Sequence, residues 1–221
     1  ANPIAITQII NQRRAIHKLV GSIWGELDII DNLVFRTSYS TDLNFGERTD
    51  WKPQFYLSET RLDASSRITA NMDRRTVWNF ENILRYNKSI GKHNFSAMIG
   101  TTIQKMNYSN IEGKNINLVA NMPEKDYLDF ALGTKADQET SGGASEHALA
   151  SFFGRLNYNH DERYLAEFTL RRDGSSNFPS SNKWAYFPSV SLGWNIHNEE
   201  FFNNEGFLNQ LKMRGSWGKN G

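Results

Sequence analysis

The chain has 221 residues, and 25 Lys and Arg side chains nearly balance 24 Asp and Glu side chains, giving a formal net charge of +1. This balance gives no bulk electrostatic reason to expect nucleic acid as a partner. The absence of cysteine excludes disulfides, thiolate metal sites and Cys nucleophiles. A mean hydropathy of −0.60, without a long uncharged apolar run, excludes a helical membrane protein, although 13% of the residues are aromatic.

The opening stretch, residues 1–20, has neither an initiator Met nor the basic and apolar regions of a signal peptide. Ile6, Ile9 and Ile10 allow a short helix, whereas Arg14–Val20 fits an N-terminal extension of the first strand. The chain ends on Gly-Lys-Asn-Gly, and an Asn-Gly pair after an alternating segment usually turns into a further strand. Both ends therefore predict a piece cut from a longer protein.

From there on, apolar and polar residues alternate with a period of two, which is typical of β-strands with two different faces. The alternation predicts four antiparallel pairs of strands: 23–29 with 33–40, 78–86 with 94–104, 152–159 with 164–171, and 188–196 with 211–217. Short turns are predicted at 31–32, 87–92 and 159–163, long polar loops at 42–75, 105–147 and 173–184, and a connection at 198–209. Asn82 is the one polar residue out of phase.

Charged side chains keep to the polar face within these windows. They are Glu26, Asp28, Arg36, Glu81, Arg85, Arg155, Glu167, Arg171, Lys212 and Arg214. A soluble sheet would tolerate exceptions, but a lipid-facing surface would not, because an Arg or Lys near the bilayer midplane costs roughly 2–4 kcal/mol. Aromatic residues gather where the apolar rows end, as in the two girdles of a membrane barrel: Tyr86, Phe95, Tyr158 and Tyr164 flank short turns, and Tyr39, Trp78 and Trp217 lie toward the long loops.

The pattern favours an all-β protein, an antiparallel transmembrane β-barrel that is partial, with about eight strands of a larger barrel. In lipid such a sheet must close, so that no strand edge is left unpaired. A water-soluble β-sandwich also alternates, and a secreted carbohydrate-binding module of that kind remains an open alternative. A self-contained eight-stranded barrel is a third interpretation, which the long loops and the two ends oppose.

More specific motifs lie in the second half of the chain. They are SFFGRLNY at 151–158, YLAEFTLRRDGSS at 164–176, WAYFPSVSLGW at 184–194 and LKMRGSWG at 211–218. Their order and spacing resemble the C-terminal barrel half of SusC/RagA-type TonB-dependent outer-membrane transporters of Bacteroidota. The Asn-Pro-Ile opening, DNLVFR at 31–36 and Gly-Lys-His at 91–93 are similar to the same family. The resemblance covers almost the whole chain and is most specific over 151–218.

The resemblance implies that residues 1–221 are part of one plugged barrel of ~22 strands, whose plug, TonB-contacting segment and remaining strands lie outside this sequence. It implies TonB-dependent import of oligosaccharides or peptides across the bacterial outer membrane, in contact with outer-membrane lipid. A SusD-like surface lipoprotein would be the partner. Neither enzymatic activity, nor a cofactor, nor a nucleic-acid partner is expected.

Two sets of candidate functional residues follow. Side chains of the polar face would line the barrel interior, where they either pair across strands and hold the plug or contact the passing substrate: Arg36, Glu81, Arg85, Arg155, Glu167, Arg171, Lys212 and Arg214. Aromatic side chains in the long loops would stack on a sugar, meet the lipoprotein or build small loop cores: Trp51, Phe55, Tyr56, Tyr127 and Phe130.

Other polar clusters are interpreted as solvated turns rather than as catalytic or metal sites. His160-Asp161-Glu162, and His197 with Glu199-Glu200, reproduce no known ligand spacing. Glu26 and Asp28 share a strand face, but no second strand fixes their separation as glycoside cleavage requires. The run at 173–176 lacks the residues of a phosphate loop or a serine elbow.

Overall fold

The computed structural model describes residue 9 and residues 11–118, 127–202 and 207–220. Strands make up most of it: β1 (Asn11–Ile30), β2 (Leu33–Lys52), β3 (Phe55–Ser58), β4 (Arg61–Asp63), β5 (Arg67–Ile90), β6 (His93–Ile116), β7 (Glu139–His160), β8 (Tyr164–Ser175), β9 (Trp184–Asn195) and β10 (Lys212–Gly218). Four 3₁₀ turns connect them: η2 (Leu128–Phe130), η3 (Lys135–Asp137), η4 (Ser180–Asn182) and η5 (Ile196–Asn198). Among the described residues, no helix is long and apolar enough to span a membrane.

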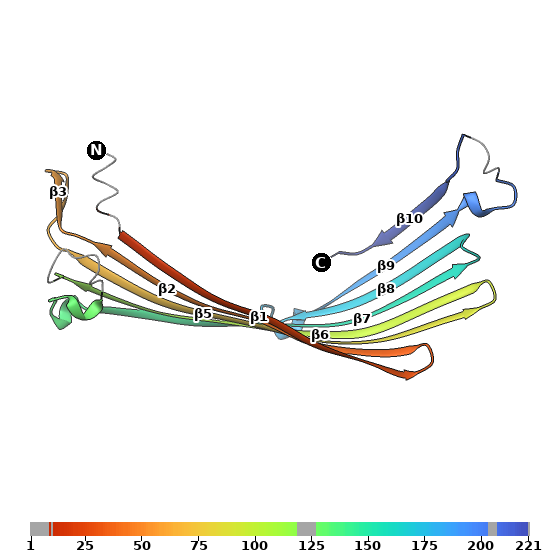
Figure 1. Ribbon diagram of the computed structural model, residues 1–221, viewed down its shortest axis with the longest axis horizontal. Coiled ribbons are helices and arrows are strands. Elements are labelled where there is room, and N and C mark those ends of the chain that lie inside the picture. Colours follow the sequence, from red (N-terminus) through yellow and green to blue (C-terminus); the bar gives the residue numbers. More distant parts are fainter. Residues whose placement is uncertain (1–8, 10, 119–126, 203–206, 221) are drawn as a thin grey trace. The chain divides into compact units, whose positions relative to one another are not determined.

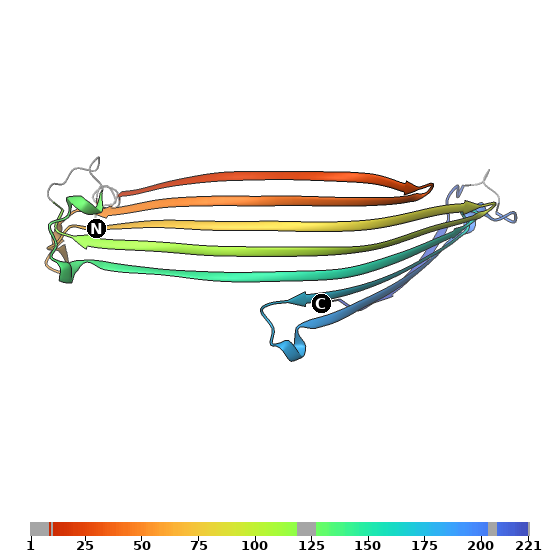
Figure 2. The same ribbon diagram turned by 90° about the horizontal axis from the view of Figure 1, so that it is seen from below.

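Eight of the strands form one sheet, in the order β1-β2-β5-β6-β7-β8-β9-β10. Each strand lies beside the next along the chain, as Figure 2 shows, and β3 and β4 form a separate hairpin between β2 and β5. The prediction of an all-β antiparallel sheet of about eight strands is confirmed. The sandwich alternative required apolar rows to meet between two packed sheets, whereas the described residues form this single sheet and the small hairpin.

Tight turns join β1 to β2, β5 to β6 and β7 to β8, and their sequences fit them. Asn32 and Gly91 have φ values of 69° and 56°, a left-handed conformation that Asn and Gly adopt most easily. Asp161 and Glu162 are also left-handed, and the Asn159 side chain accepts a hydrogen bond of 3.0 Å from the Glu162 backbone amide. Two turns are shorter than predicted, because strand pairing continues to Ile90 and to His160.

The strands are much longer than predicted. β5 and β6 have 24 residues each, against the ~9–11 that cross a bilayer at a tilt. The loops expected at 42–75 and 105–147 are wrong in extent, because β2, β5, β6 and β7 occupy much of both ranges. The physical reason is that ladder hydrogen bonds need no apolar residues. Where both faces of a strand are wet, as in the sequence ETSGGASE at the start of β7, the period-two signal disappears while pairing continues.

The chain divides into two compact units, and the long strands contribute residues to both. Unit 1 comprises residues 1–20, 41–77 and 106–146, and unit 2 comprises residues 21–40, 78–105 and 147–221. Arg14–Val20, in unit 1, is strand, which confirms the predicted extension of the first strand. The alternative helix around Ile6 and Ile10 falls on residues outside the described part of the chain.

Unit 1 has a small core of its own. Trp51 and Ile68, with 6% and 0% of their surface exposed, are the buried hydrophobic residues of the described chain. Beside them, Ser66 accepts backbone hydrogen bonds of 2.8 Å from Asn117 at its carbonyl and from Leu118 at its hydroxyl. These bonds fasten the end of β6 to the start of β5, so unit 1 is stabilised by burial and by hydrogen bonds between its own segments.

Candidate functional site

Backbone pairing across β7, β8, β9 and β10 separates polar from apolar side chains. Directly opposed residues in an antiparallel sheet share a face, and neighbouring residues along a strand point to opposite faces. The register defines one polar row and, next to it, one apolar row: Asn157, Glu167, Ser191 and Ser216, then Leu156, Phe168, Val190 and Trp217. The predicted alternation therefore corresponds to two chemically different faces of one sheet.

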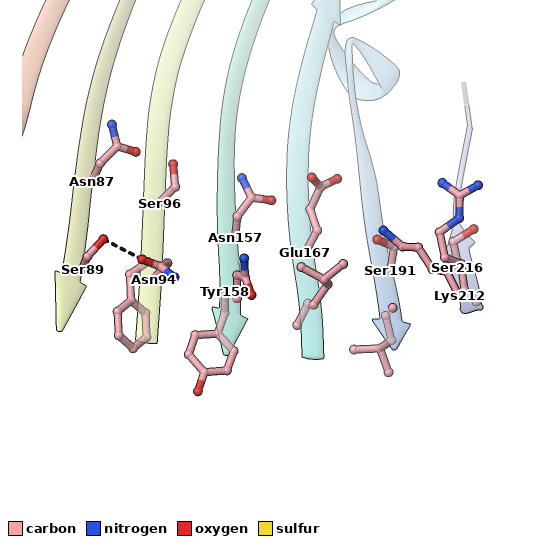
Figure 3. A pocket seen from close by; sticks show the side chains of 18 residues that line it. Asn87, Ser89, Asn94, Ser96, Asn157, Tyr158, Glu167, Ser191, Lys212 and Ser216 are labelled. Atoms are coloured by element: carbon pink, nitrogen blue, oxygen red, sulfur yellow. Dashed lines mark hydrogen bonds between the residues drawn. The ribbon is translucent and has the colours of Figure 1, made fainter. Parts of the chain in front are cut away.

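The polar face carries a hollow of about 660 Å³ near the short turns (Figure 3). Asn157 and Glu167 point to one side of the strands, and the Tyr158 ring points to the other. Ser89 donates a hydrogen bond of 2.6 Å to the Asn94 side chain within the hollow. Four asparagines and four serines are among the lining residues, with Glu167, Lys212 and Arg214 as its charges, and such groups suit hydrogen bonding to a polar ligand or to polypeptide.

Three of the candidate lumen residues form contacts across strands. Arg155 and Glu167 approach to 4.0 Å between Nε and Oε2. The Arg171 Nε donates to both carboxylate oxygens of Asp173, at 2.8 and 2.7 Å, and its Nη2 donates to Ser151 at 2.9 Å. Arg171 is therefore held by its neighbours and has limited freedom to follow a moving substrate.

The remaining candidates are held less tightly. The Arg36 guanidinium lies 4.9 Å from the centre of the Trp24 ring, and Thr102 donates a long hydrogen bond of 3.4 Å to Glu81. Arg85, Lys212 and Arg214 form no ion pair with any described residue. Lys212 and Arg214 line the hollow of Figure 3, so these two cations are available to a ligand there.

The opposite face of unit 2 is apolar and left uncovered. Ile99 and Leu192 each expose 62% of their surface, and no hydrophobic residue among the described residues of unit 2 is buried. Asn82, predicted to be out of phase, lies on this face and accepts a hydrogen bond of 2.9 Å from Thr37. That bond satisfies polar groups that would otherwise be costly in an apolar environment.

Aromatic rings border the apolar face at both ends, as predicted. Near the short turns, ring centres of Phe95 and Tyr158 are 5.0 Å apart and those of Tyr164 and Trp194 are 6.5 Å apart. Toward the long connections, Tyr39 stacks on Trp78 at 6.5 Å. Phe152 and Trp184 form a second pair at that end, with ring centres 5.9 Å apart.

The sequence interpretation missed cations toward the ends of the apolar face: Lys88 on β5, Lys105 on β6 and Arg172 on β8. Arg172 lies opposite Phe152 and Tyr186, and it follows Leu170 on the same face of β8. The window in which charges were counted ended at Arg171. Counting two residues on from Leu170 would have placed Arg172 among the aromatic residues of the apolar face.

The candidate loop aromatics all lie in unit 1, but their exposures differ. Trp51 is buried at the end of β2, which leaves little of its ring for a ligand. Tyr56 and Tyr127 expose 69% and 58% of their surface. Phe55 lies beneath the Lys52 ammonium, and Phe130 lies 6.0 Å from the Tyr127 ring centre.

The turn clusters form no metal site. No group of three or more potential ligands comes together among the described residues. The hydrogen bond from Lys92 holds the pKa of Asp161 below its ordinary value, against a smaller opposing effect of burial. Hydrogen bonds from Trp194 and Tyr164, together with the charge of Arg163, lower the pKa of Glu199. Asp161 therefore joins two neighbouring turns, and Glu199 fastens the start of the β9–β10 connection to β8 and β9.

Known proteins resemble the chain in sequence and in structure. No profile of a known protein family matches it. Over 221 residues the chain is 32% identical to TonB-dependent receptor P3 of Formosa agariphila. The alignment covers 100% of this chain and 22% of the relative. Over 139 residues it is 37% identical to TonB-dependent receptor SusC of Bacteroides thetaiotaomicron, covering 62% of this chain and 13% of the relative.

The solved structure of the RagAB peptide transporter superposes with a TM-score of 0.86 at 20% identity, over 96% of this chain and 23% of that chain. The sheet therefore has the fold of part of a TonB-dependent transporter barrel. Within that class, the resemblance to the SusC/RagA type predicted from the motifs is confirmed. The chain spans about a fifth of the length of receptor P3.

Proposed function

We propose that the chain is part of the barrel of a SusC-like importer, which moves nutrients across the bacterial outer membrane with energy delivered through TonB. The observation that carries this proposal is the exposed apolar face of unit 2. Its side chains have no protein core to enter, and the cations of its strands lie on the other face, apart from Lys88, Lys105 and Arg172 toward its ends. Hydrocarbon is the environment that suits such a surface.

The dimensions of the apolar face support the proposal. On β8, the apolar positions run from Tyr164 to Leu170 and end at Arg172. At ~3.4 Å per residue, Tyr164 and Arg172 are about 27 Å apart along the strand. A tilt of ~40° reduces this to about 20 Å across the bilayer, close to the ~25 Å apolar band of an outer-membrane barrel. The turns β1–β2, β5–β6 and β7–β8 then face the periplasm, and the connections β2–β5, β6–β7 and β8–β9 face the outside.

Substrate and partners belong to the same proposal. The polar hollow, with its asparagine and serine side chains and the free cations Lys212 and Arg214, suits an oligosaccharide or a peptide. It equally suits the polypeptide of a plug. Exposed Tyr56 and Tyr127 in unit 1 are candidates for contact with a SusD-like surface lipoprotein or with the substrate, and TonB would act through parts of the protein outside this chain.

The test compares the two faces in the full-length receptor. Phe168→Lys and Leu192→Lys place a cation in the apolar band, and each should reduce outer-membrane assembly by more than tenfold, because the cost is roughly 2–4 kcal/mol. Ser191→Lys, next to Leu192 but on the polar face, is the matched control and should assemble normally. The readouts are the amount of folded receptor in isolated outer membranes and growth on the transported nutrient. Normal assembly of both apolar-face variants would contradict the proposal.

A further inference from the structure

Arg172 occupies a position that the import function does not explain. It belongs to the apolar face, whereas Arg171 beside it points to the polar face and is held by Asp173 and Ser151. Along β8 it follows Phe168 and Leu170 on the same face, at the end nearer the longer connection. The side chain is therefore a cation at one border of an apolar surface.

Aromatic rings hold the guanidinium in place. The Arg172 Cζ lies 4.4 Å from the ring centre of Trp184 and 5.4 Å from that of Tyr186. Trp184 can lie flat here because its backbone partner is Gly174, and any side chain at that position would overlap its ring. Cation–π contacts of this kind orient a guanidinium. They do not use its N–H donors, which point outward in the plane of the guanidinium group.

The donors of Arg172 have no protein acceptor. Among the described residues Arg172 forms neither an ion pair nor a side-chain hydrogen bond, and its buried Nε has no partner. Leaving a charged donor without a partner away from water costs more free energy than leaving a neutral donor in that state. A guanidinium presents parallel N–H groups that match the oxygens of a phosphate, so an anion of that geometry would satisfy them.

An apolar groove begins at the same place. It has a volume of about 770 Å³ and lies wholly within unit 2, with Leu156, Phe168, Leu170, Arg172 and Tyr186 among its lining residues. Along β8 the lining runs from Phe168 through Leu170 to Arg172, so the cation lies at the end of the row that β8 contributes. A ligand that fits both parts has a hydrocarbon chain and a phosphate at one end.

We propose that Arg172, Trp184 and Tyr186 bind the phosphate group of an outer-leaflet lipid whose acyl chain lies in the groove. The inference rests on the proposed function, which places this face against the membrane and the longer connections on the outside. Charge complementarity selects the occupant, because an uncharged lipid or a second protein without an anion would leave the Arg172 donors unsatisfied.

The experiment uses the full-length receptor in detergent and native mass spectrometry with two added lipids, dioleoyl phosphatidic acid and dioleoylglycerol. Their chains are identical, but only the first carries a phosphate group. The wild-type receptor should retain the anionic lipid about tenfold more strongly, and Arg172→Gln should remove this preference. Arg214→Gln, a charge removal on the opposite face, is the control and should keep it. Inorganic phosphate should not compete, because it lacks the chain.

A wild-type receptor without preference, or Arg172→Gln with unchanged preference, would overturn the proposed lipid site. If Arg172→Gln does not assemble, Trp184→Leu provides the second test, since loss of the ring should also weaken the preference. Failure of the import function itself looks different, because a receptor without a lipid-facing surface would remain soluble without detergent and retain neither lipid.

Discussion

Units 1 and 2 are built from the same continuous strands, yet they treat apolar side chains in opposite ways. Unit 1 buries Trp51 and Ile68 in a small core and fastens its segments with hydrogen bonds, as a soluble domain does. Unit 2 has long rows of exposed apolar side chains and buries no hydrophobic residue in its described part. The difference shows that strand length does not define a membrane span; the length of the apolar row does.

The largest effect is expected from the core of unit 1. Ile68→Ala should lower the stability of this unit by about 2–5 kcal/mol, because the side chain is fully buried and its loss leaves a cavity. Hydrogen exchange of the full-length receptor should show faster exchange at the start of β5 and at the β3–β4 hairpin. Ile111→Ala, which removes an exposed side chain of the same unit, should leave exchange unchanged. Equal effects of the two changes would show that Ile68 does not belong to a stabilising core of unit 1.

A matched pair on a single strand compares the units directly. Ile99 and Ile111 lie on the same face of β6 and expose 62% and 63% of their surface, but Ile99 belongs to unit 2 and Ile111 to unit 1. Ile99→Lys should cost about 2–4 kcal/mol and prevent assembly, whereas Ile111→Lys should cost almost nothing because water can solvate the new charge. Heat-modifiable migration on gels measures the folded fraction of the receptor. Equal folded fractions for the Ile99→Lys and Ile111→Lys variants would contradict the difference between the two units.

A smaller effect is expected at the polar pair on the apolar face of unit 2. Thr37→Val leaves the Asn82 amide without its partner and should destabilise the folded receptor by about 0.6–1.7 kcal/mol, the size of interhelical hydrogen bonds in membranes. Adding Asn82→Leu should recover the lost stability, since both side chains of the pair are then apolar. Denaturant unfolding of the reconstituted receptor measures both values, and a further loss in the double variant would contradict the assignment to lipid.

The smallest effect concerns pH and unit 1. Burial acts to raise the pKa of Asp63, but hydrogen bonds from Lys52 and Ser65 and the charge of Arg67 outweigh it, so the pKa lies below its ordinary value of 3.8. Because the folded-state pKa is the lower one, the stabilisation is complete above about pH 4 and is lost as pH falls through the folded-state value. Its size should stay near 1 kcal/mol, because Lys52 and Arg67 are largely exposed.

Asp63→Asn provides the check for this ion-pair cluster. It should remove the acid-dependent part of the protection of the β3–β4 hairpin, measured as hydrogen exchange between pH 5 and pH 3, and leave the apolar band of unit 2 unchanged. An unaltered pH profile in this variant would show that the ion pairs of Asp63 do not stabilise unit 1.

Sequence alone predicted the parts of the fold where one face is apolar. The eight strands, their chain order, their two faces and the aromatic borders follow from alternation, because an apolar row on one face fixes the register. The outer parts of β2, β5, β6 and β7 could not be found this way, since polar residues occur on both of their faces and interrupt the alternation. For Trp51, contact with a ligand and a place in a small loop core were both left open; the side chain is buried, and burial depends on contacts between distant segments that a period does not encode.

Arg172 shows the limit within the site. Alternation counted from Leu170 assigns it to the apolar face, but only the register brings Trp184 and Tyr186 beside it. The lumen residues were predicted as a set, while the structure separates the held Arg171 from the free Lys212 and Arg214. Which of these touches a substrate or a plug remains a prediction.

The central claim is that the apolar rows of unit 2 face hydrocarbon. Because this chain has no cysteine, single spin labels can be introduced into it at will. Labels at residues 98, 99 and 111 of the full-length receptor in liposomes would be compared for collision with oxygen, which concentrates in lipid, and with a water-soluble nickel chelate. Only the label at 99 should favour oxygen, while those at 98 and 111 should favour the chelate. A label at 99 that collides preferentially with the chelate would contradict the claim.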